Sequence, residues 1–351
     1  MASSSPAWWA PARVILTLMI GAAGGALFAY ANLPAAWLAG SMIAVSAAVM
    51  AGFPAAIYDP ARVAVFIILG IQIGGSIGPD TLQRMSQWPA SVAALTVTVL
   101  AVTWSGYAFF RYVHGWDRPT ALFSSVPGAL SLTLLLADDA RADMPRVTIV
   151  QCVRLFFLVS VLPGVITIMQ GGNSASIVAP TASSLRDGVL LLGVGTAGGF
   201  AAERLKLPAG LILGALAASA AVSLMGLVHD PLSNLILFPA YIILGSMIGA
   251  RFQSFDRRLI GRLLLAGISG FAVALVVALA GTLAASAVSD IPLTHMLVAF
   301  APGGLEAMTI MAFALNLDPA YVGSMQIVRY IGISVLLPLA AKWLERRWRE
   351  A

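Results

Sequence analysis

Two arginines stand in the middle of long apolar stretches, and each lies in the same local pattern. Arg154 occurs in "VTIVQCVRLFF" and Arg329 in "VGSMQIVRYIG", with Gln151 and Gln326 three residues before them. Residues three apart share one face of a helix, so each arginine lies beside an amide. A guanidinium group binds a carboxylate or a phosphate through two parallel hydrogen bonds. The pattern therefore favours a binding site for an anionic organic solute.

Both arginines are expected near the middle of a membrane. Each lies about eight residues inside its apolar segment, which is about 12 Å along a helix and close to the centre of a hydrocarbon core about 30 Å thick. An arginine at that depth costs about 2.5–3.5 kcal/mol on insertion scales. Two roles would justify this cost: binding the solute, or hydrogen bonding to the open backbone carbonyls of a neighbouring broken segment. The sequence leaves both roles open.

Two other apolar segments carry helix breakers at equivalent places. "SVPGALS" contains Pro127 and Gly128, and "FAPGGLE" contains Pro302, Gly303 and Gly304. Proline disrupts a helix, and the backbone groups that it frees inside a membrane must be buried in protein or face water. We therefore predict two re-entrant tips whose backbone groups bind a polar solute or an ion. The alternative is that each Pro-Gly pair only kinks a packed helix.

Glu306 follows the second break and has no acidic counterpart, because Ser131 holds the equivalent position. A lone carboxylate in a membrane carries a coupling proton or pairs with an arginine, and we favour the pairing. It would also be placed to accept hydrogen bonds from free backbone N–H groups where a helix restarts.

Residues for other chemistries are scarce. His114, His229 and His295 are far apart in the sequence, and Cys152 is the only cysteine, so we expect no metal site, no cofactor and no disulfide. We find no spacing that offers a nucleophile with its base, and we expect no catalytic residue and no enzyme activity. The ATP-binding pattern Gly-x-x-x-x-Gly-Lys-Ser/Thr is absent, which argues against primary pumping by this chain alone.

Composition places these residues in a membrane protein. The chain has 351 residues, of which 60% are hydrophobic and 10% are charged, whereas soluble domains carry about 25% charged residues. Apolar runs long enough to cross a bilayer recur along the chain, and the alternating segments of a barrel do not appear. No stretch is long, polar and basic enough for a nucleic-acid-binding module. We therefore expect a polytopic helical protein whose partners are lipids and a small solute, without nucleic acid.

The chain also repeats itself. Four blocks recur in the same order at an offset of 174 or 175 residues; they begin at Gly21 and Gly195, Phe66 and Tyr241, Ser125 and Phe300, and Gln151 and Gln326. Such a series indicates a duplication. We predict a first membrane repeat over residues 1–172, a linker over residues 173–187 and a second repeat over residues 188–351.

Charge placement predicts how the repeats are oriented. Each half has six apolar segments, which in the first half cover about residues 14–31, 34–52, 63–78, 88–110, 120–137 and 147–169. If the broken fifth segment is re-entrant, sixteen of the twenty Lys and Arg residues face the cytoplasm; if all six segments cross, nine face each side. The positive-inside rule favours the first arrangement. We therefore predict an all-α polytopic membrane protein of two inverted-topology repeats, each with about five transmembrane helices and one broken or re-entrant segment. The termini would be cytoplasmic and the linker periplasmic.

The paired motifs resemble those of the AbrB-type duplicated membrane proteins. The resemblance rests on "PAAWLAGSM" with "PAGLILGAL", "IILGIQIG" with "IILGSMIG", "VPGALS" with "APGGLEAM" and the two Gln-x-Val-Arg blocks, and it covers nearly the whole chain. It implies a multi-pass protein of the bacterial inner membrane, and a transporter. Family labels have included "ammonia monooxygenase" and "transcriptional regulator AbrB". Neither suits these residues, because a copper oxygenase needs a histidine-rich site and a DNA-binding regulator needs a soluble basic module.

Inverted repeats with broken helices are typical of secondary transporters. We predict a secondary transporter that moves a small anionic organic solute by alternating access, coupled to a proton or a sodium ion. The predicted substrate-binding residues are Arg154, Arg329, Gln151, Gln326, Glu306, Pro127, Gly128, Pro302, Gly303 and Gly304. The alternatives are a channel, an assembly subunit without transport of its own, or the membrane oxygenase of the family label. The sequence leaves open whether the protein forms a homodimer.

Overall fold

The computed structural model describes residues 9–78, 81, 83, 85, 88–128, 130–171, 184–207, 209–228, 230, 232–254 and 257–349. These residues form helices and connecting turns, without a strand among them. Six of the helical segments are long and apolar enough to cross a membrane, namely Pro11–Tyr30, Trp88–Val113, Met144–Met169, Asn234–Gln253, Gly261–Ser286 and Pro319–Pro338. The expected polytopic helical architecture is confirmed to that extent.

Four helices that were expected to cross are not among these six: α2 (Ala36–Met50), α3 (Asp59–Gly75), α9 (Leu185–Arg204) and α10 (Gly210–Leu224). Helices α2 and α10 have 15 residues each, which is about 22 Å of helix against a hydrocarbon core of about 30 Å. Most of the predicted linker lies outside the described residues.

The chain divides into two compact units, and each unit takes helices from both halves of the sequence. The first contains Met1–Pro79, Val159–Ser254 and Ala314–Asn316, and the second contains Asp80–Leu158, Phe255–Phe313 and Leu317–Ala351. The predicted repeats describe the order of the chain, whereas these units describe its packing, so the two divisions differ.

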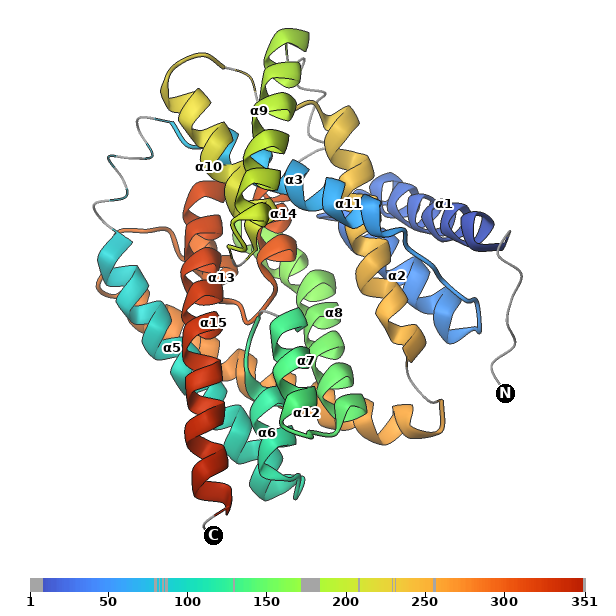
Figure 1. The fold of residues 1–351 in the computed structure, drawn as a ribbon, viewed down its shortest axis with the longest axis vertical. Coiled ribbons are helices and arrows are strands. Elements are labelled where there is room, and N and C mark those ends of the chain that lie inside the picture. The colour runs from blue at the N-terminus through green and yellow to red at the C-terminus, as the bar shows by residue number, and fades with distance from the viewer. Residues whose placement is uncertain are drawn as a thin grey trace. The chain divides into compact units, whose positions relative to one another are not determined.

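The first unit is built from helix pairs that pack reciprocally (Figure 1). Its helices are α1 (Trp9–Tyr30), α2, α3, α9, α10, α11 (Asn234–Ala250) and the end of α8 (Met144–Met169), followed after α11 by the short helix η2 (Arg251–Ser254). Helix α1 packs on α2 as α9 packs on α10, and α3 packs on α10 as α11 packs on α2. Glycines permit this packing: a methyl group on Gly24 would overlap the carbonyl of Gly40, and one on Gly198 would overlap that of Gly214. Close contact through small residues is how helices associate in lipid.

Left-handed residues repeat in the same way as the helices. Outside glycine, the described backbone has a positive φ at three pairs of residues with the repeat offset: Asn32 and Lys206, Ala35 and Ala209, and Arg141 and Asn316, with φ between 51° and 55°. A left-handed conformation costs an L-residue about 1–2 kcal/mol, so matching positions do not arise by accident. The duplication inferred from the sequence is therefore present in the backbone.

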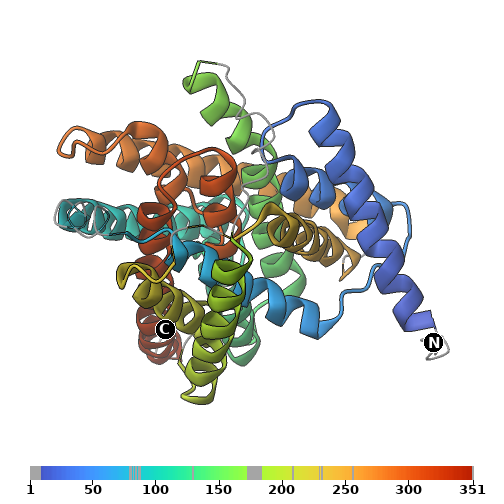
Figure 2. The same cartoon turned by 90° about the horizontal axis from the view of Figure 1, so that it is seen from above.

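The second unit holds the two broken segments. Its helices are α5 (Trp88–Ala108), the π-helix η1 (Phe109–Val113), α6 (Arg118–Ser125), α7 (Leu130–Asp139), the start of α8, α12 (Arg257–Ser286), α13 (Leu293–Phe300), α14 (Leu305–Ala314) and α15 (Pro319–Arg349). Helices α5 and α12 run along each other (Figure 2), and Val102, Ala274 and Ala278 form a buried cluster between them.

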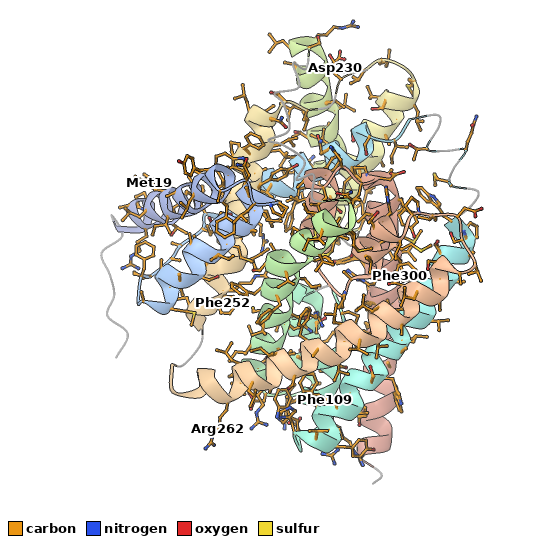
Figure 3. All side chains as sticks on the ribbon, turned by 180° about the vertical axis from the view of Figure 1, so that it is seen from behind. Met19, Phe109, Asp230, Phe252, Arg262 and Phe300 are labelled. Atoms are coloured by element: carbon orange, nitrogen blue, oxygen red, sulfur yellow. The ribbon has the colours of Figure 1, made fainter. Side chains whose placement is uncertain are left out.

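Many large apolar side chains lie on the surface of the units. Met19 is 61% exposed on the outer face of α1 (Figure 3), and Trp104 on α5 is 72% exposed. In water such surfaces would promote aggregation, whereas lipid solvates them without cost. They agree with the membrane location that the long apolar helices indicate.

Candidate solute-binding site

Each broken segment consists of two short helices on either side of its Pro-Gly sequence. Helix α6 ends at Ser125 and α7 begins at Leu130, while α13 ends at Phe300 and α14 begins at Leu305. Helices of eight or ten residues are about 12–15 Å long and cannot cross a bilayer alone. The prediction that both segments break at Pro-Gly is confirmed.

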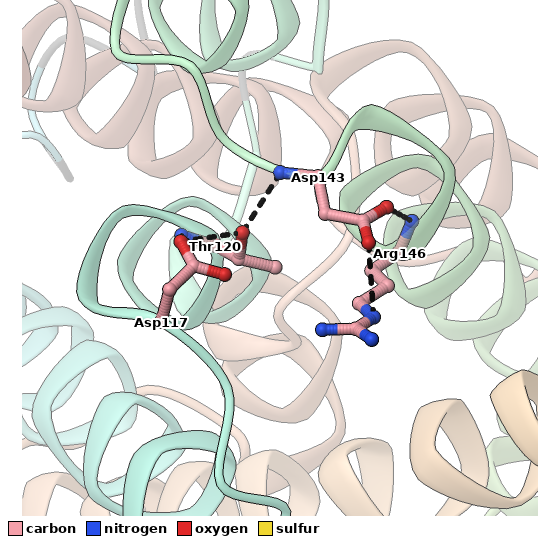
Figure 4. A network of polar contacts seen from close by, with 4 residues as sticks. All are labelled: Asp117, Thr120, Asp143 and Arg146. Carbon is pink, nitrogen blue, oxygen red and sulfur yellow. Dashed lines mark hydrogen bonds and ion pairs between the residues drawn. The ribbon is translucent and has the colours of Figure 1, made fainter.

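The first broken segment reverses direction at its tip. Thr120, in the first turn of α6, accepts a hydrogen bond through Oγ1 from the N–H of Asp143, which follows α7 (2.8 Å) (Figure 4). The same hydroxyl donates to Oδ2 of Asp117 (2.8 Å), which also accepts from the N–H of Thr120 (3.0 Å). The start of α6 and the end of α7 therefore lie together. Helices α6 and α7 form a hairpin with Pro127 and Gly128 at its tip.

Asp143 links this hairpin to the helix that carries the first arginine. Its Oδ1 accepts the N–H of Arg146 (3.2 Å), and its Oδ2 forms an ion pair with Arg146 Nε (3.1 Å), both in the first turn of α8. Capping of this kind fixes where a helix begins. Because α8 starts beside the hairpin base, its third turn brings Gln151 and Arg154 alongside α6.

Gln151 and Arg154 together hold the carbonyl end of α6. Arg154 Nη1 donates to Val126 O (3.1 Å), and Nη2 donates to Gln151 Oε1. Gln151 Nε2 donates to Phe123 O (2.9 Å) and to Val126 O (3.0 Å). Both side chains are buried, with exposed fractions of 1% and 3%. A helix that ends in a membrane leaves open carbonyls, and this pair satisfies them.

Gln326 and Arg329 do the same for the second break. Arg329 Nη1 donates to Ala301 O, and Nη2 donates to Gly303 O and to Gln326 Oε1. Gln326 Nε2 donates to Ala299 O (3.0 Å). Of the two roles open to the arginines, hydrogen bonding to the carbonyls of a broken segment is therefore observed in both repeats.

The two tips meet at Arg329. Gly128 has a φ of 92°, and a methyl group built on it would lie 3.5 Å from Arg329 Nε and 3.6 Å from Gly303 O. The two breaks therefore lie close together, although 175 residues separate them in the sequence. A glycine at position 128 permits the left-handed backbone and lets the first tip pack directly against the guanidinium.

Both guanidinium groups have only neutral partners among the residues that the structure describes. Their acceptors are backbone carbonyls and glutamine oxygens, and no carboxylate lies within ion-pair distance of either one. Arg154 Nε has no hydrogen-bond partner among the described residues. Each arginine lies within electrostatic reach of the other. The tips therefore enclose two buried positive charges that no carboxylate of a described residue pairs with.

Glu306 does not form the ion pair that we favoured from the sequence. It lies half-buried in the first turn of α14, and its carboxylate makes no hydrogen bond or ion pair with any described residue. The physical reason is that the break leaves the carbonyls of Ala301 and Gly303 without helical partners, and Arg329 directs its terminal nitrogens at them and at the Gln326 amide oxygen. Nor does Glu306 accept a backbone N–H at the start of α14.

Sequence reasoning missed the residues that orient the hairpin. Asp117 and Thr120 flank "RP" in "DRPT", and an acidic residue followed by proline in the first turn is a known start signal for a helix. That signal predicts the cap of α6. It does not predict that the Thr120 hydroxyl also accepts a hydrogen bond from the N–H of Asp143, which follows the far end of α7.

Known proteins are similar to this chain over nearly its full length. The family model described as "Transition state regulatory protein AbrB" matches residues 37–345. The chain is similar to "Putative regulator AbrB" of Escherichia coli (strain K12), with 29% identity over 328 residues, which covers 90% of this chain and 92% of that protein. It is also similar to "Uncharacterized protein YhjN" of Bacillus subtilis (strain 168), with 24% identity over 347 residues, which covers 92% of this chain and 90% of the relative. With two broken helical segments, duplicated Gln-x-Val-Arg sites and a match over most of its length, the chain belongs to the AbrB family.

Proposed function

We propose that this protein is a secondary transporter that moves a small organic anion across the bacterial inner membrane. The observation that carries the proposal is the pair of buried guanidinium groups at the two helix breaks, whose partners among the described residues are all neutral. Burying an uncompensated charge is costly, and an anion between the tips would relieve that cost. Gly128 places the backbone of the first tip beside Arg329, with no side chain between them.

Hydrogen bonding to the carbonyls of a broken segment and binding of a solute are compatible roles for these arginines. Hydrogen bonds to carbonyls satisfy the N–H groups but leave the positive charge, because a carbonyl carries no net charge. A solute carboxylate would interact with that charge and with Arg154 Nε. The hydrogen bonds to the carbonyls also hold each guanidinium rigid, which lowers the entropic cost of binding a solute.

We further propose that the repeats are inverted in the membrane. Reciprocal packing in the first unit is expected of any two-fold relation, whether its axis lies in the membrane plane or along the normal. Loop charges favour inversion: "FQSFDRRLIGR" is basic, while its partner "PDTLQRMSQW" has one arginine. In this topology the α6–α7 hairpin enters from the cytoplasm and α13–α14 from the periplasm, so each side has access to one tip.

Glu306 is our candidate for the residue that binds the coupling ion. A half-buried carboxylate without a partner among the described residues is available to take up a proton or a sodium ion. Because it lies beside the second tip, its neutralisation would change the local field at Arg329. The first repeat has Ser131 at this position, so coupling would act through one tip only.

Transport also fits this chain better than regulation of transcription, which the names of the family and of the E. coli relative suggest. A regulator needs a polar, basic surface to contact DNA. The described residues form mainly apolar helices with large exposed hydrophobic side chains.

Counterflow in proteoliposomes tests the proposal. Vesicles loaded with one unlabelled organic anion receive the same labelled anion outside, and the probes are acetate, succinate, glutamate and phenylacetate. We expect at least one probe to accumulate transiently above equilibrium, as exchange through a carrier requires. Equilibration without such an overshoot would indicate a channel, and no protein-dependent flux of any probe would contradict transport of small organic anions.

A further inference from the structure

An apolar cavity inside the second unit reaches Arg329. Its volume is about 130 Å³, and it lies between α5, the end of α6 and α15. Leu95, Ile333 and Leu337 form buried walls, and Val99 lines the cavity as well. Among the described residues that line it, Arg329 alone is charged. Both lining threonines donate their hydroxyls to carbonyls of their own helix, so they add no free polar group.

The cavity exists because two positions on its wall carry small side chains. Gly332 and Thr96 line it from opposite helices, and a methyl group on Gly332 would meet nothing within 4 Å. The repeat offset of 175 residues maps Gly332 onto Phe157 and Thr96 onto Phe271. Those two phenylalanines stack on each other, with ring centroids 5.7 Å apart and an interplanar angle of 19°.

The two repeats thus differ in whether side chains fill this equivalent space. Between α8 and α12 the chain fills it with its own phenyl rings, whereas between α15 and α5 it leaves the space empty beside a buried positive charge. An engineered cavity of about 150 Å³ stays dry and binds benzene, so a space of this size accepts one aromatic ring. A second charge or an ammonium group on the guest would be desolvated against apolar walls.

We propose that this cavity holds the apolar part of the transported anion while the carboxylate of that anion lies at Arg329. The substrate class is then an amphipathic monocarboxylate with an aryl group or a compact alkyl group of similar size, in contrast to dicarboxylates and amino acids. This inference rests on the proposed transport function, because it assigns the substrate of the same arginine site.

Filling the cavity with the side chain that the other repeat uses is the test. Gly332→Phe adds a ring where a methyl group has free space, and Gly164→Phe in α8 is the matched control, because a methyl group there also meets nothing within 4 Å. Apparent affinities for phenylacetate, the neutral phenylacetamide, acetate and succinate are measured in lipid nanodiscs from the rise of the melting temperature with concentration. If Gly332→Phe does not fold, Thr96→Phe enters the same cavity from α5.

We expect the wild type and Gly164→Phe to bind phenylacetate at least tenfold more tightly than acetate or succinate. Gly332→Phe should bind phenylacetate at least tenfold more weakly than the wild type, with its affinity for acetate unchanged. Phenylacetamide should not bind, because it lacks the charge that Arg329 requires.

Other results would overturn the inference in distinguishable ways. Equal binding of phenylacetate to Gly332→Phe and the wild type would remove the cavity from the site but keep the anion site itself. Tighter binding of succinate than phenylacetate would have the same meaning. Binding of phenylacetamide as tight as that of phenylacetate would make the cavity a site for neutral apolar molecules or lipid chains. Absence of binding by every anion to the wild type would remove the proposed function as well.

Discussion

At the scale of single residues, the glutamine three positions before each arginine explains how a charge is held in an apolar unit. Its amide oxygen accepts from the guanidinium, and its amide nitrogen donates to the carbonyl end of a broken helix. The arginine then donates to carbonyls at the break itself. A lysine keeps the charge but has no planar fork with which to reach an amide and a carbonyl together.

Lysine variants should therefore separate the two roles of each arginine. Arg329 donates to two tip carbonyls and Arg154 to one, and a hydrogen bond to a charged group contributes about 1.5–3 kcal/mol. We expect Arg329→Lys to lower the free energy of unfolding by about 1.5–3 kcal/mol more than Arg154→Lys, as measured by thermal unfolding followed through tryptophan fluorescence.

Exposed Arg186 supplies the control, and Arg186→Lys should leave the melting temperature unchanged. If Arg154 or Arg329 also binds the solute, its lysine variant should lose stabilisation by the anion. Lower stability with unchanged anion binding in both variants would assign the site to the backbone of the tips alone.

At the scale of elements, the α6–α7 hairpin depends on one hydroxyl. Thr120 Oγ1 joins the start of α6 to the backbone that leaves α7, and Asp117 and Asp143 complete the network (Figure 4). Neither helix is long enough to be stable by itself. The contact at the base, together with the Gln151 and Arg154 contacts near the tip, therefore determines the path of the broken segment.

Thr120→Val removes that hydroxyl without changing the shape of the side chain. The N–H of Asp143 loses its acceptor, and an unsatisfied buried donor costs about 1–3 kcal/mol. We expect a loss of stability of that size, together with faster hydrogen exchange in residues 118–139. Thr309→Val is the control, because Thr309 donates only to the Leu305 carbonyl of its own helix (2.8 Å), and that change should be nearly neutral. Equal effects of the two variants would contradict the role of Thr120.

At the scale of the whole molecule, duplication has produced two units that each combine both repeats. The first unit preserves the symmetry closely, with matching helix pairs and matching left-handed turns. The second unit preserves the arginine sites but differs at Glu306 and at the cavity beside Gly332. Asymmetry is thus concentrated where the proposed site lies, which is expected if one tip carries coupling and substrate selection.

Equivalent turn residues offer a direct test of inversion. Arg141 and Asn316 hold corresponding left-handed positions, with φ of 54° and 52°, and both are exposed. In a Cys152→Ser background, we expect Arg141→Cys to react with an impermeant maleimide only after the membrane is opened, and Asn316→Cys to react in intact cells. Labelling of both from the same side would mean that the repeats are parallel, because inversion places equivalent turns on opposite sides.

Much of the local structure could be predicted from the sequence. The length and hydropathy of the segments predict most of the long helices, Pro127-Gly128 and Pro302-Gly303 predict the breaks, and the repeated blocks predict matching backbone turns. Each of these features depends on neighbouring residues, because helix formation, proline geometry and burial of an apolar stretch are local properties. The pairing of Gln151 with Arg154 is likewise local, since three residues span one helical turn.

Only the tertiary structure decided which partners these residues have. Arg154 reaches a carbonyl 28 residues away, Gly128 meets Arg329 from another repeat, and Glu306 is left without the arginine that the sequence favoured for it. The cavity beside Gly332 depends on the spacing of α5 and α15, and no pattern within either helix contains that spacing. Contacts between distant segments depend on how whole helices pack, and packing sums many weak interactions that a local sequence pattern does not encode.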